Sequence, residues 1–279
     1  IVADNGSTDN TELIAQESSS KFKNFRYIYD ARPGQLVGWH RSLFEAEGEI
    51  TCFIDDDIIP SNNWLSALAD AYSDPTVGMA TGPIKLRTSC KDLPSWLEYM
   101  KLGEPGSQTL PYLTLLDFGN VVRDIPGNFV WGSNFSVRKS LLLDVGGFHP
   151  GAMPARLLHY YGDGEIFVGR EVGQRGYRTI YHPYAEVEHD ISKERFTMKA
   201  VRSKFMTSGC ARSFQTLRAT GQVFEIPDPE ELLELSNRYF NNPDQVPEEL
   251  KQVVQFALRD GMCRQLHAFE VDSHFREWV

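Results

Sequence analysis

Short apolar runs alternate with longer amphipathic stretches along the first two-thirds of the chain, and this alternation limits the possible folds more than any other feature. Runs typical of buried strands cover residues 1–3, 25–29, 50–54, 77–81, 129–137, 179–182 and 185–189. Helical patterns cover 10–18, 36–47, 60–72 with Ser61 as the expected N-cap, the stretch from Arg138 to Gly146, and 164–175. Such alternation favours an α/β fold with helices on both faces of a mostly parallel sheet. In these sheets ligands bind beyond the carboxyl ends of the strands.

The character of the sequence changes near residue 191, where we place a domain boundary. Residues 1–191 carry the α/β pattern, with an irregular interval at 90–126. Residues 192–279 carry a basic and apolar stretch at 193–220 and acidic helical patterns at about 229–240 and 247–258. We therefore expect a ligand-binding α/β domain followed by a helical extension.

The composition excludes some classes of protein. The 279-residue chain has a formal net charge of −10, which argues against a nucleic-acid partner, because that function needs a basic surface. The cysteines (Cys52, Cys90, Cys210 and Cys263) form no CxxC pair and indicate reduced thiols in the cytoplasm. No apolar run reaches the roughly 20 residues that cross a bilayer, and the N-terminus lacks the basic start of a signal peptide. We expect a cytoplasmic protein.

Three consecutive carboxylates, Asp55, Asp56 and Asp57, follow the apolar run at 50–54. Carboxylates this close repel one another when ionised and lose solvation beside a buried strand. A divalent cation removes the repulsion, and Mg²⁺ or Mn²⁺ is commonly held by one or two carboxylates while substrate phosphates complete its coordination. The alternative is a solvated acidic turn before the next helix. The triplet thus indicates a site for Mn²⁺ or Mg²⁺.

Polar residues also stand at the ends of other elements. Asp4 follows the first strand, where its carboxylate can accept a hydrogen bond from a nucleobase N–H or the turn can simply cap the next helix. Asp163 and Glu165 open a helix, where the helix dipole favours carboxylates and where either residue can act as a general base. His189 ends a strand, and a neutral imidazole can join carboxylates around Mn²⁺.

Taken in order, the segments DNGSTDNT, FIDDDIIP, GSNFSVRKSLLLDVGGF and GDGEIF…GYRTIYHP…VEHD resemble the inverting family 2 glycosyltransferases of the Rossmann-like GT-A fold. The resemblance covers about residues 1 to 220. It implies metal-dependent transfer of a sugar from a nucleotide-diphosphate sugar to a hydroxyl of a glycan or lipid-linked acceptor. Family members begin with a strand and a helix before the segment that matches Ile1–Ser7, so we expect the sequence to be truncated upstream.

The resemblance also implies roles for matching residues. It places Asp4 at the nucleobase, with Asp9 supporting its loop. It places Asp55 at the ribose or sugar hydroxyls and Asp57 at the metal that bridges the diphosphate. Asp56 belongs to the same nucleotide-sugar site without an assigned role. The residues matched to the lining of the sugar pocket are Gly132, Ser133 and Asn134.

Two residues compete for the role of general base. Counting back from the Gly-Tyr pair at 176–177 puts Glu165 at the base position. The first acid of the family's usual acidic pair would fall at Gly164, which leaves Asp163 as a competing base. In either case the base takes the proton of the acceptor hydroxyl in a single displacement while the metal neutralises the departing diphosphate.

Other functions fit parts of the sequence. A haloacid-dehalogenase-like phosphohydrolase would use Asp55 and Asp57 as nucleophile and acid. A non-catalytic module would bind nucleotides or glycans on the same fold. Processive family members carry a Q-x-x-R-W motif, whereas this chain has QTLRA at 215–219, so we do not expect it to polymerise sugars.

Basic and apolar residues are interleaved from Lys193 to Lys204. The simpler interpretation is an amphipathic helix that packs its apolar face on the core. The alternative is a surface for an anionic acceptor or for the inner face of a membrane, with which the protein would associate peripherally.

Overall fold

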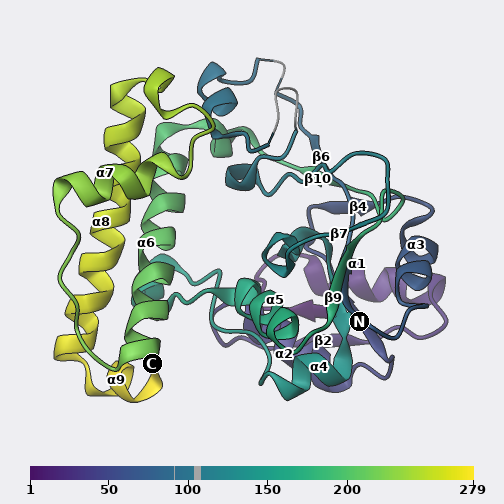
Figure 1. Cartoon of the computed structure of the whole chain (residues 1–279). Helices are drawn as coiled ribbons and strands as arrows, with labels where there is room; N and C mark the ends of the chain where they lie inside the picture. Colours follow the sequence, from purple (N-terminus) through teal and green to yellow (C-terminus); the bar gives the residue numbers. More distant parts are fainter. Residues whose placement is uncertain (91, 104–107) are drawn as a thin grey trace.

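The computed structural model describes residues 1–90, 92–103 and 108–279, and Figure 1 shows an α/β part beside a group of C-terminal helices. The strands are β1 (Val2–Asp4), β2 (Tyr27–Tyr29), β3 (Ile50–Phe53), β4 (Ile58–Pro60), β5 (Val77–Thr81), β6 (Ile84–Arg87), β7 (Arg123–Asp124), β8 (Phe135–Arg138), β9 (Arg178–Tyr181) and β10 (Val187–Asp190). The helices are α1 (Thr11–Ser18), α2 (Gln35–Glu45), α3 (Trp64–Ala71), α4 (Lys139–Asp144), α5 (Gly164–Gln174), α6 (Met198–Thr220), α7 (Pro229–Asn237), α8 (Glu248–Val271) and α9 (Ser273–Trp278).

The strands form three hydrogen-bonded groups. The largest has the order β3-β8-β5-β9-β7, the second has the order β4-β10-β6, and β1 pairs with β2. The pairs β1/β2, β5/β9 and β6/β10 are parallel, whereas β3/β8, β5/β8, β7/β9 and β4/β10 are antiparallel. The predicted α/β class with helices on both faces is confirmed, but its strand pairing is mixed where we expected it to be mostly parallel.

The direction of β8 explains much of this difference and also builds the site. Phe135 at its start pairs with Phe53 at the end of β3, and Arg138 at its end pairs with Ile50. The chain therefore enters β8 at the edge where β3 finishes, and β8 must run backwards between β3 and β5. As a result, the turn before β8 lies next to the acidic loop after β3.

Most predicted elements are confirmed, but the short strands β4, β6 and β7 were not predicted, and other differences concern predicted segments. Residues 129–134, predicted as the first half of a strand, are not a strand, because 3₁₀ turns at Gly127–Phe129 and Gly132–Asn134 precede β8. Ser61 is not the N-cap of α3, because Pro60 still belongs to β4 and the helix begins at Trp64. The interval 90–126 contains 3₁₀ turns at Ser95–Met100 and Pro111–Leu113, while residues 91 and 104–107 lie outside the described residues.

An aromatic cluster fixes α2 against the sheet. The Trp39 ring on α2 stacks on Phe53 of β3, with centroids 4.8 Å apart, and meets Phe148 edge-on at 5.2 Å. Phe135 of β8 lies 6.0 Å from the Phe53 ring. Such pairs contribute about 0.5–1.5 kcal/mol each beyond their buried area. The cluster fixes the position of α2 relative to the end of β3.

The long helices α6 and α8 pack backbone against backbone. A Cβ atom added to Gly209 would lie 2.1 Å from the Leu258 carbonyl oxygen, and one added to Gly261 would lie 2.0 Å from that of Met206. Only glycine fits at these crossings. This close contact fixes α6, whose other side faces the α/β part (Figure 1).

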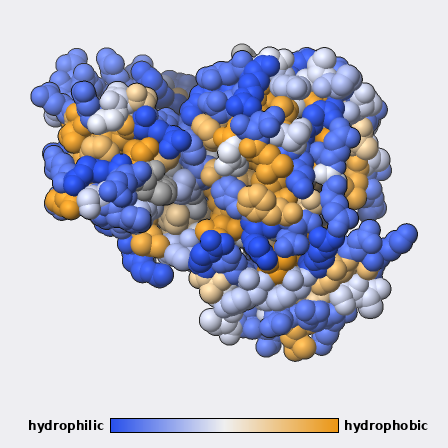
Figure 2. Space-filling model, turned by 90° about the horizontal axis from the view of Figure 1, so that it is seen from below, coloured by the Kyte–Doolittle hydropathy of each residue, from blue (hydrophilic) through white to orange (hydrophobic). Residues whose placement is uncertain are grey.

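The surface mixes hydrophilic and hydrophobic residues, and the hydrophobic ones gather in separate patches on the face shown in Figure 2. At the start of α6, Val201 and Phe205 are buried in the core while Lys199 and Arg202 are exposed, so the apolar residues of this stretch pack on the core as the simpler interpretation predicted. Within the described residues no helix is long and apolar enough to cross a membrane. The cysteines predicted to be reduced are all free thiols.

Candidate active site

The acidic loop between β3 and β4 presents its carboxylates in different directions. Asp55 is half-buried, and its Oδ1 accepts a hydrogen bond from Gln35 Nε2 at the start of α2. Asp56 and Asp57 are exposed. The three acids therefore do not form one cluster, since one is held inside the molecule and two face solvent.

Burial raises the pKa of Asp55 to about 7, and the neighbouring carboxylates of Asp57 and Glu165 contribute to the shift through repulsion. Asp55 therefore lies within electrostatic reach of both acids although Glu165 is far away in the sequence. An acid with this pKa changes its charge near neutral pH, unlike an ordinary aspartate. A cation or a hydrogen-bond donor brought to this position would favour its ionised form.

We expect Asp55→Asn to raise the melting temperature of the metal-free protein, with a gain that grows between about pH 4 and pH 7. The pKa of Asp55 is about 7 in the folded protein and 3.8 ordinarily, so the folded state binds this proton more tightly. The wild-type protein therefore loses stability as the pH rises through this interval, and the asparagine variant avoids the loss. Thermal unfolding at a series of pH values measures the effect.

Asp56→Asn is the matched control for this experiment, because Asp56 is adjacent but exposed, and water solvates its charge in the folded and unfolded states alike. A gain in stability for Asp55→Asn that stays constant with pH would contradict the prediction. It would mean that packing, and not charge, distinguishes the two side chains.

Strand pairing brings Asp57 and His189 together. His189 on β10 pairs with Ile58 on β4, and the Asp190 N–H donates to the Asp57 carbonyl oxygen over 2.8 Å. His189 Nε2 lies 3.4 Å from Asp57 Oδ2, and this contact lowers the pKa of Asp57. The His189 side chain is nearly buried, and its Nδ1 has no hydrogen-bond partner among the described residues. The two residues predicted as metal ligands therefore face each other.

The chemistry of this pair fits a hard divalent cation with few protein ligands. Over residues 1–90, 92–103 and 108–279 there is no group of three or more side chains that could hold a metal, so the site would have two protein ligands. The 3.4 Å between the donor atoms is near the ~3 Å expected for adjacent ligands with bonds of ~2.1 Å. Mg²⁺ commonly takes one or two carboxylates and completes its shell with water and substrate phosphates.

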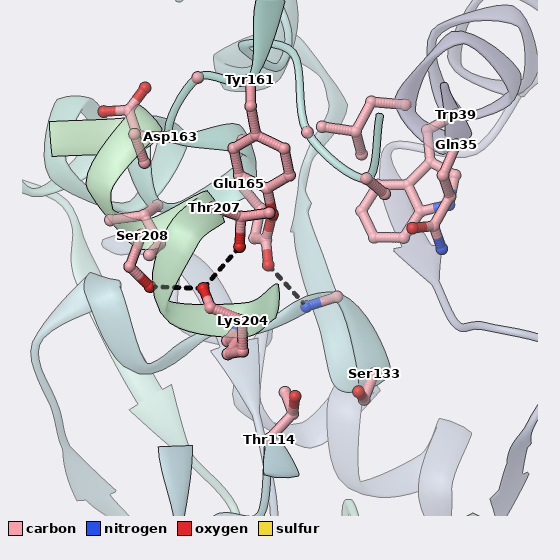
Figure 3. Close-up of a pocket in the computed structure, with 18 of the residues that line it drawn as sticks. Gln35, Trp39, Thr114, Ser133, Tyr161, Asp163, Glu165, Lys204, Thr207 and Ser208 are labelled. Atoms are coloured by element: carbon pink, nitrogen blue, oxygen red, sulfur yellow. Dashed lines mark hydrogen bonds between the residues drawn. The ribbon is translucent and has the colours of Figure 1, made fainter. Parts of the chain in front are cut away.

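Asp163 and Glu165, at the start of α5, have different surroundings. The Asp163 carboxylate is 1% exposed, and His149 Nδ1 lies 2.5 Å from its Oδ1. Its Oδ2 accepts hydrogen bonds from Gln215 (3.0 Å) and Arg170 (3.3 Å). These partners outweigh the effect of burial and lower the pKa of Asp163. Figure 3 shows this carboxylate directed away from Glu165.

Glu165, by contrast, faces the pocket drawn in Figure 3. Its Oε1 accepts the backbone N–H of Gly132 at 3.3 Å, and the part of the chain that the structure describes gives its carboxylate no other hydrogen bond. The Gly132 contact orients one oxygen and leaves the other for a ligand. Of the two competing bases, Glu165 has the accessible carboxylate.

A cavity of about 240 Å³ unites several of these residues. It is lined by Asp55, Asp163 and Glu165, and also by Gly132 and Ser133 from the turn before β8. The predicted residues that do not line it are Asp4, Asp9, Asp56, Asp57, His189 and Asn134.

Asn134 has a packing role in the structure. Its side chain is completely buried, where the amide oxygen accepts a hydrogen bond from Trp64 Nε1 (2.9 Å). Its amide nitrogen donates to the Ala185 carbonyl oxygen over 2.8 Å. Asn134 thus joins α3 to the loop before β10, and it supports the turn that carries Gly132 and Ser133.

Asp4 is held at the end of β1 by two donors. It is 4% exposed, and its carboxylate accepts hydrogen bonds from the Ser7 N–H (2.7 Å) and the Tyr27 hydroxyl (2.6 Å). Although burial favours the neutral acid, these bonds prevail and lower the pKa of Asp4. Asp9 is exposed, and its Oδ1 accepts the Thr11 N–H at the start of α1 (3.0 Å). Both residues fix the shape of the turn.

The turn at Asp4 is connected to the cavity through its neighbour. Asn5 Nδ2 donates to the carbonyl oxygens of Asp30 (2.9 Å) and Arg32 (2.7 Å). The segment they belong to leads into Gln35, which hydrogen-bonds to Asp55. The turn at Asp4 and the acidic loop at Asp55 are therefore linked through the segment from Asp30 to Gln35, which hydrogen-bonds to Asn5 at one end and to Asp55 at the other.

Several residues of the cavity were not predicted as site residues. They are Gln35, Trp39, Tyr161, Lys204, Thr207, Ser208 and Gln215. Figure 3 shows Gln35 and Trp39 on one side and Lys204, Thr207 and Ser208 on the other. The spacing of 204, 207, 208, 211 and 215 is that of one helix face, so the sequence did contain a signal for the α6 side.

The α/β fold, with acidic residues converging at the ends of its strands, is that of GT-A glycosyltransferases. The model of the family "Glycosyl transferase family 2" matches residues 1–146, which is more than half of the chain. The chain belongs to glycosyl transferase family 2. This membership replaces the haloacid-dehalogenase-like interpretation of the acidic triplet.

Two curated relatives come from Haloferax volcanii. The chain is 29% identical to glycosyltransferase AglE over 86 residues, which are 30% of this chain and 28% of AglE. It is 24% identical to glucosyl-dolichyl phosphate glucuronosyltransferase over 151 residues, which are 53% of this chain and 45% of that protein. The chain therefore matches less than half the length of either relative.

A solved structure shares the fold. The mannosyltransferase PcManGT from Pyrobaculum calidifontis, in complex with GDP-Man and Mn²⁺, superimposes with a TM-score of 0.50 at 16% identity. The match covers 99% of this chain and 72% of that one. It supports the GT-A-like fold of this chain.

Proposed function

We propose that the chain transfers a sugar from a nucleotide-diphosphate sugar to a hydroxyl acceptor by a single displacement with inversion. The observation that carries the proposal is the convergence of Asp55 and the accessible carboxylate of Glu165 on one cavity, beside the Asp57–His189 pair. A volume of about 240 Å³ is below the ~300–1,000 Å³ of drug-sized ligand sites and suits a single sugar ring.

Glu165 acts in this mechanism as the general base. It accepts the proton of the acceptor hydroxyl as the oxygen attacks the anomeric carbon, and the diphosphate leaves from the opposite face. The Gly132 N–H keeps Glu165 oriented, and the anchored Asp163 holds the start of its helix in place. Holding the base, the acceptor hydroxyl and the sugar of the donor in one arrangement supplies a further part of the rate.

The remaining predicted residues bind the donor. Asp55 hydrogen-bonds to its ribose or sugar hydroxyls, while Gly132 and Ser133 line the sugar site. The turn shaped by Asp4 and Asp9 receives the nucleobase, and Asp56 stands at the rim of the same site. Asn134 contributes by supporting the turn before β8.

Asp57 and His189 would hold Mn²⁺ or Mg²⁺ at this site. When bound, the ion supplies positive charge that neutralises the diphosphate of the donor. The related fold of the P. calidifontis mannosyltransferase was solved with GDP-Man and Mn²⁺, which supports a nucleotide-sugar donor and a divalent ion here.

We also propose that the chain divides near residue 191 into two parts that share one site. The helix α6 of the second part supplies Lys204 and Gln215 to the cavity of the first.

The H. volcanii relative named for glucosyl-dolichyl phosphate supports a lipid-linked or glycan acceptor. With it we propose a cytoplasmic protein that contacts the inner face of a membrane through residues Lys193–Lys204.

Donor binding tests the proposal. We expect a UDP-, GDP- or TDP-linked sugar to raise the melting temperature of the protein more in the presence of Mn²⁺ than with EDTA, because the ion links donor to protein. Release of nucleoside diphosphate then separates an enzyme from a non-catalytic module on the same fold. Absence of metal-dependent stabilisation by any of these donors would contradict the proposal.

A further inference from the structure

A second cavity lies beside the first, along the start of α6. Its volume is about 630 Å³, within the ~300–1,000 Å³ typical of small-molecule sites. Ala152, Tyr161, Lys204 and Thr207 line both cavities, so the second one is continuous with the wall of the first. We call this second cavity the basic groove, and the residues that define it are Arg195, Lys199, Lys204, Glu194 and Met153.

The basic groove has a charge opposite to that of the molecule. It contains three cationic side chains and one carboxylate, whereas the whole chain has a net charge of −10. Among the described residues none of Arg195, Lys199 and Lys204 forms an ion pair. The Glu194 carboxylate is hydrogen-bonded within its own turn, which lowers its pKa, and its single negative charge offsets only one of the three cations. Their charge is left for a ligand.

The same cations reach the site of chemistry. Burial lowers the pKa of Lys204, Glu165 opposes this shift, and Arg195 adds to it. Lys204 lines the first cavity together with Glu165 as well as the basic groove, so the basic groove leads towards the general base.

The turn that carries Arg195 is held in place before any ligand binds. The Tyr112 hydroxyl donates to the Arg195 carbonyl oxygen over 2.7 Å, and the ring of buried Phe196 anchors the next position. The Arg195 and Lys199 side chains themselves are exposed. A guanidinium on this fixed turn and an ammonium at the start of α6 line one cavity, where together they match the several acceptor oxygens of a phosphate.

We propose that the basic groove binds the phosphate group of a phosphate-bearing acceptor, with Arg195 and Lys199 as its main contacts. This inference rests on the proposed function, since it identifies the chemical class of the acceptor. The acceptor then extends past Lys204 so that its hydroxyl meets Glu165, and Met153 provides an apolar wall for its carbon skeleton. A lipid phosphate and a soluble sugar phosphate share this chemistry.

The test is binding of phosphate probes at low salt without any donor. We use octyl phosphate below its micelle concentration and glucose 1-phosphate, with octyl glucoside and glucose as neutral counterparts. We expect the phosphates to bind more tightly than the neutral probes. The double variant Arg195→Gln/Lys199→Gln should weaken phosphate binding by about 10- to 100-fold, the contribution expected of charged hydrogen bonds.

Arg212→Gln is the matched control, because Arg212 is an exposed cation on the same helix as Lys199 but lies outside residues 193–204 and lines neither cavity, and the affinity of this variant for the probes should equal that of the wild type. Tighter binding of octyl phosphate supports a lipid phosphate as the source, and tighter binding of glucose 1-phosphate supports a soluble one. Equal phosphate affinity of the double variant and the wild type, with thermal unfolding unchanged, would overturn the inference. Failure of donor binding would count against the proposed function alone, because no donor is present in these measurements.

Discussion

Replacing Glu165 with glutamine is expected to lower the rate of sugar transfer by about 10²- to 10⁴-fold, the usual contribution of a general base. Glutamine has nearly the same shape, and its Oε1 can still accept the Gly132 N–H that orients the glutamate. It cannot take a proton from the acceptor hydroxyl. The metal-dependent affinity for the donor should therefore persist while transfer is lost. Calorimetric donor titration and single-turnover transfer assays measure the two quantities separately.

Two further variants make this experiment decisive. Glu171→Gln changes the same side chain on the same helix outside the cavity, and we expect it to retain transfer. Asp163→Asn should reduce thermal stability, because Asp163 is a buried anchor for His149 and Gln215. Full turnover by Glu165→Gln together with loss of turnover by a stably folded Asp163→Asn would assign the base to Asp163 instead.

The residues of the site that the sequence could predict are those close to the ends of regular elements. Asp55 and Asp57 follow a strong apolar strand, and Glu165 lies in the first turn of a helix. The strand and helix periods place such residues at one edge of the sheet without any knowledge of distant contacts. For this local reason the sequence could place the acidic loop and the carboxylate of Glu165 at the same edge of the sheet.

The residues that sequence reasoning missed or misplaced depend on long-range packing. The sequence pattern of β8 predicts a strand but not whether it runs parallel or antiparallel to its neighbours. The antiparallel direction follows from the pairing of Phe135 with Phe53. The family resemblance placed Asn134 at the lining of the sugar pocket, whereas in the structure its buried amide oxygen accepts a hydrogen bond from Trp64. Lys204 and Gln215 reach the cavity only because α6 is fixed against α8 by glycine contacts. No local pattern specifies that crossing.

Replacing Asp57 with asparagine is expected to weaken Mn²⁺-dependent donor binding by at least about 100-fold, since loss of a ligand should exceed the 10- to 100-fold effect of a residue that merely supports one. His189→Gln should have a comparable effect. The two donor atoms face each other across 3.4 Å, and each would occupy one position on the same ion. Donor titrations with Mn²⁺ and with EDTA measure the effect for both single variants. Glu188→Gln is the control, because Glu188 is an exposed acid next to His189 on β10 and does not line the cavity.

The double variant Asp57→Asn/His189→Gln distinguishes a shared ion from a simple contact between the two side chains. If both residues bind one ion, the first substitution already removes most of the metal-dependent affinity, so the second adds little in Mn²⁺. With EDTA, neither substitution should change donor affinity appreciably. Fully additive losses in Mn²⁺, or equal losses in Mn²⁺ and EDTA, would show that the pair acts without a common cation, and the repulsion among Asp55, Asp57 and Glu165 would then require another source of positive charge.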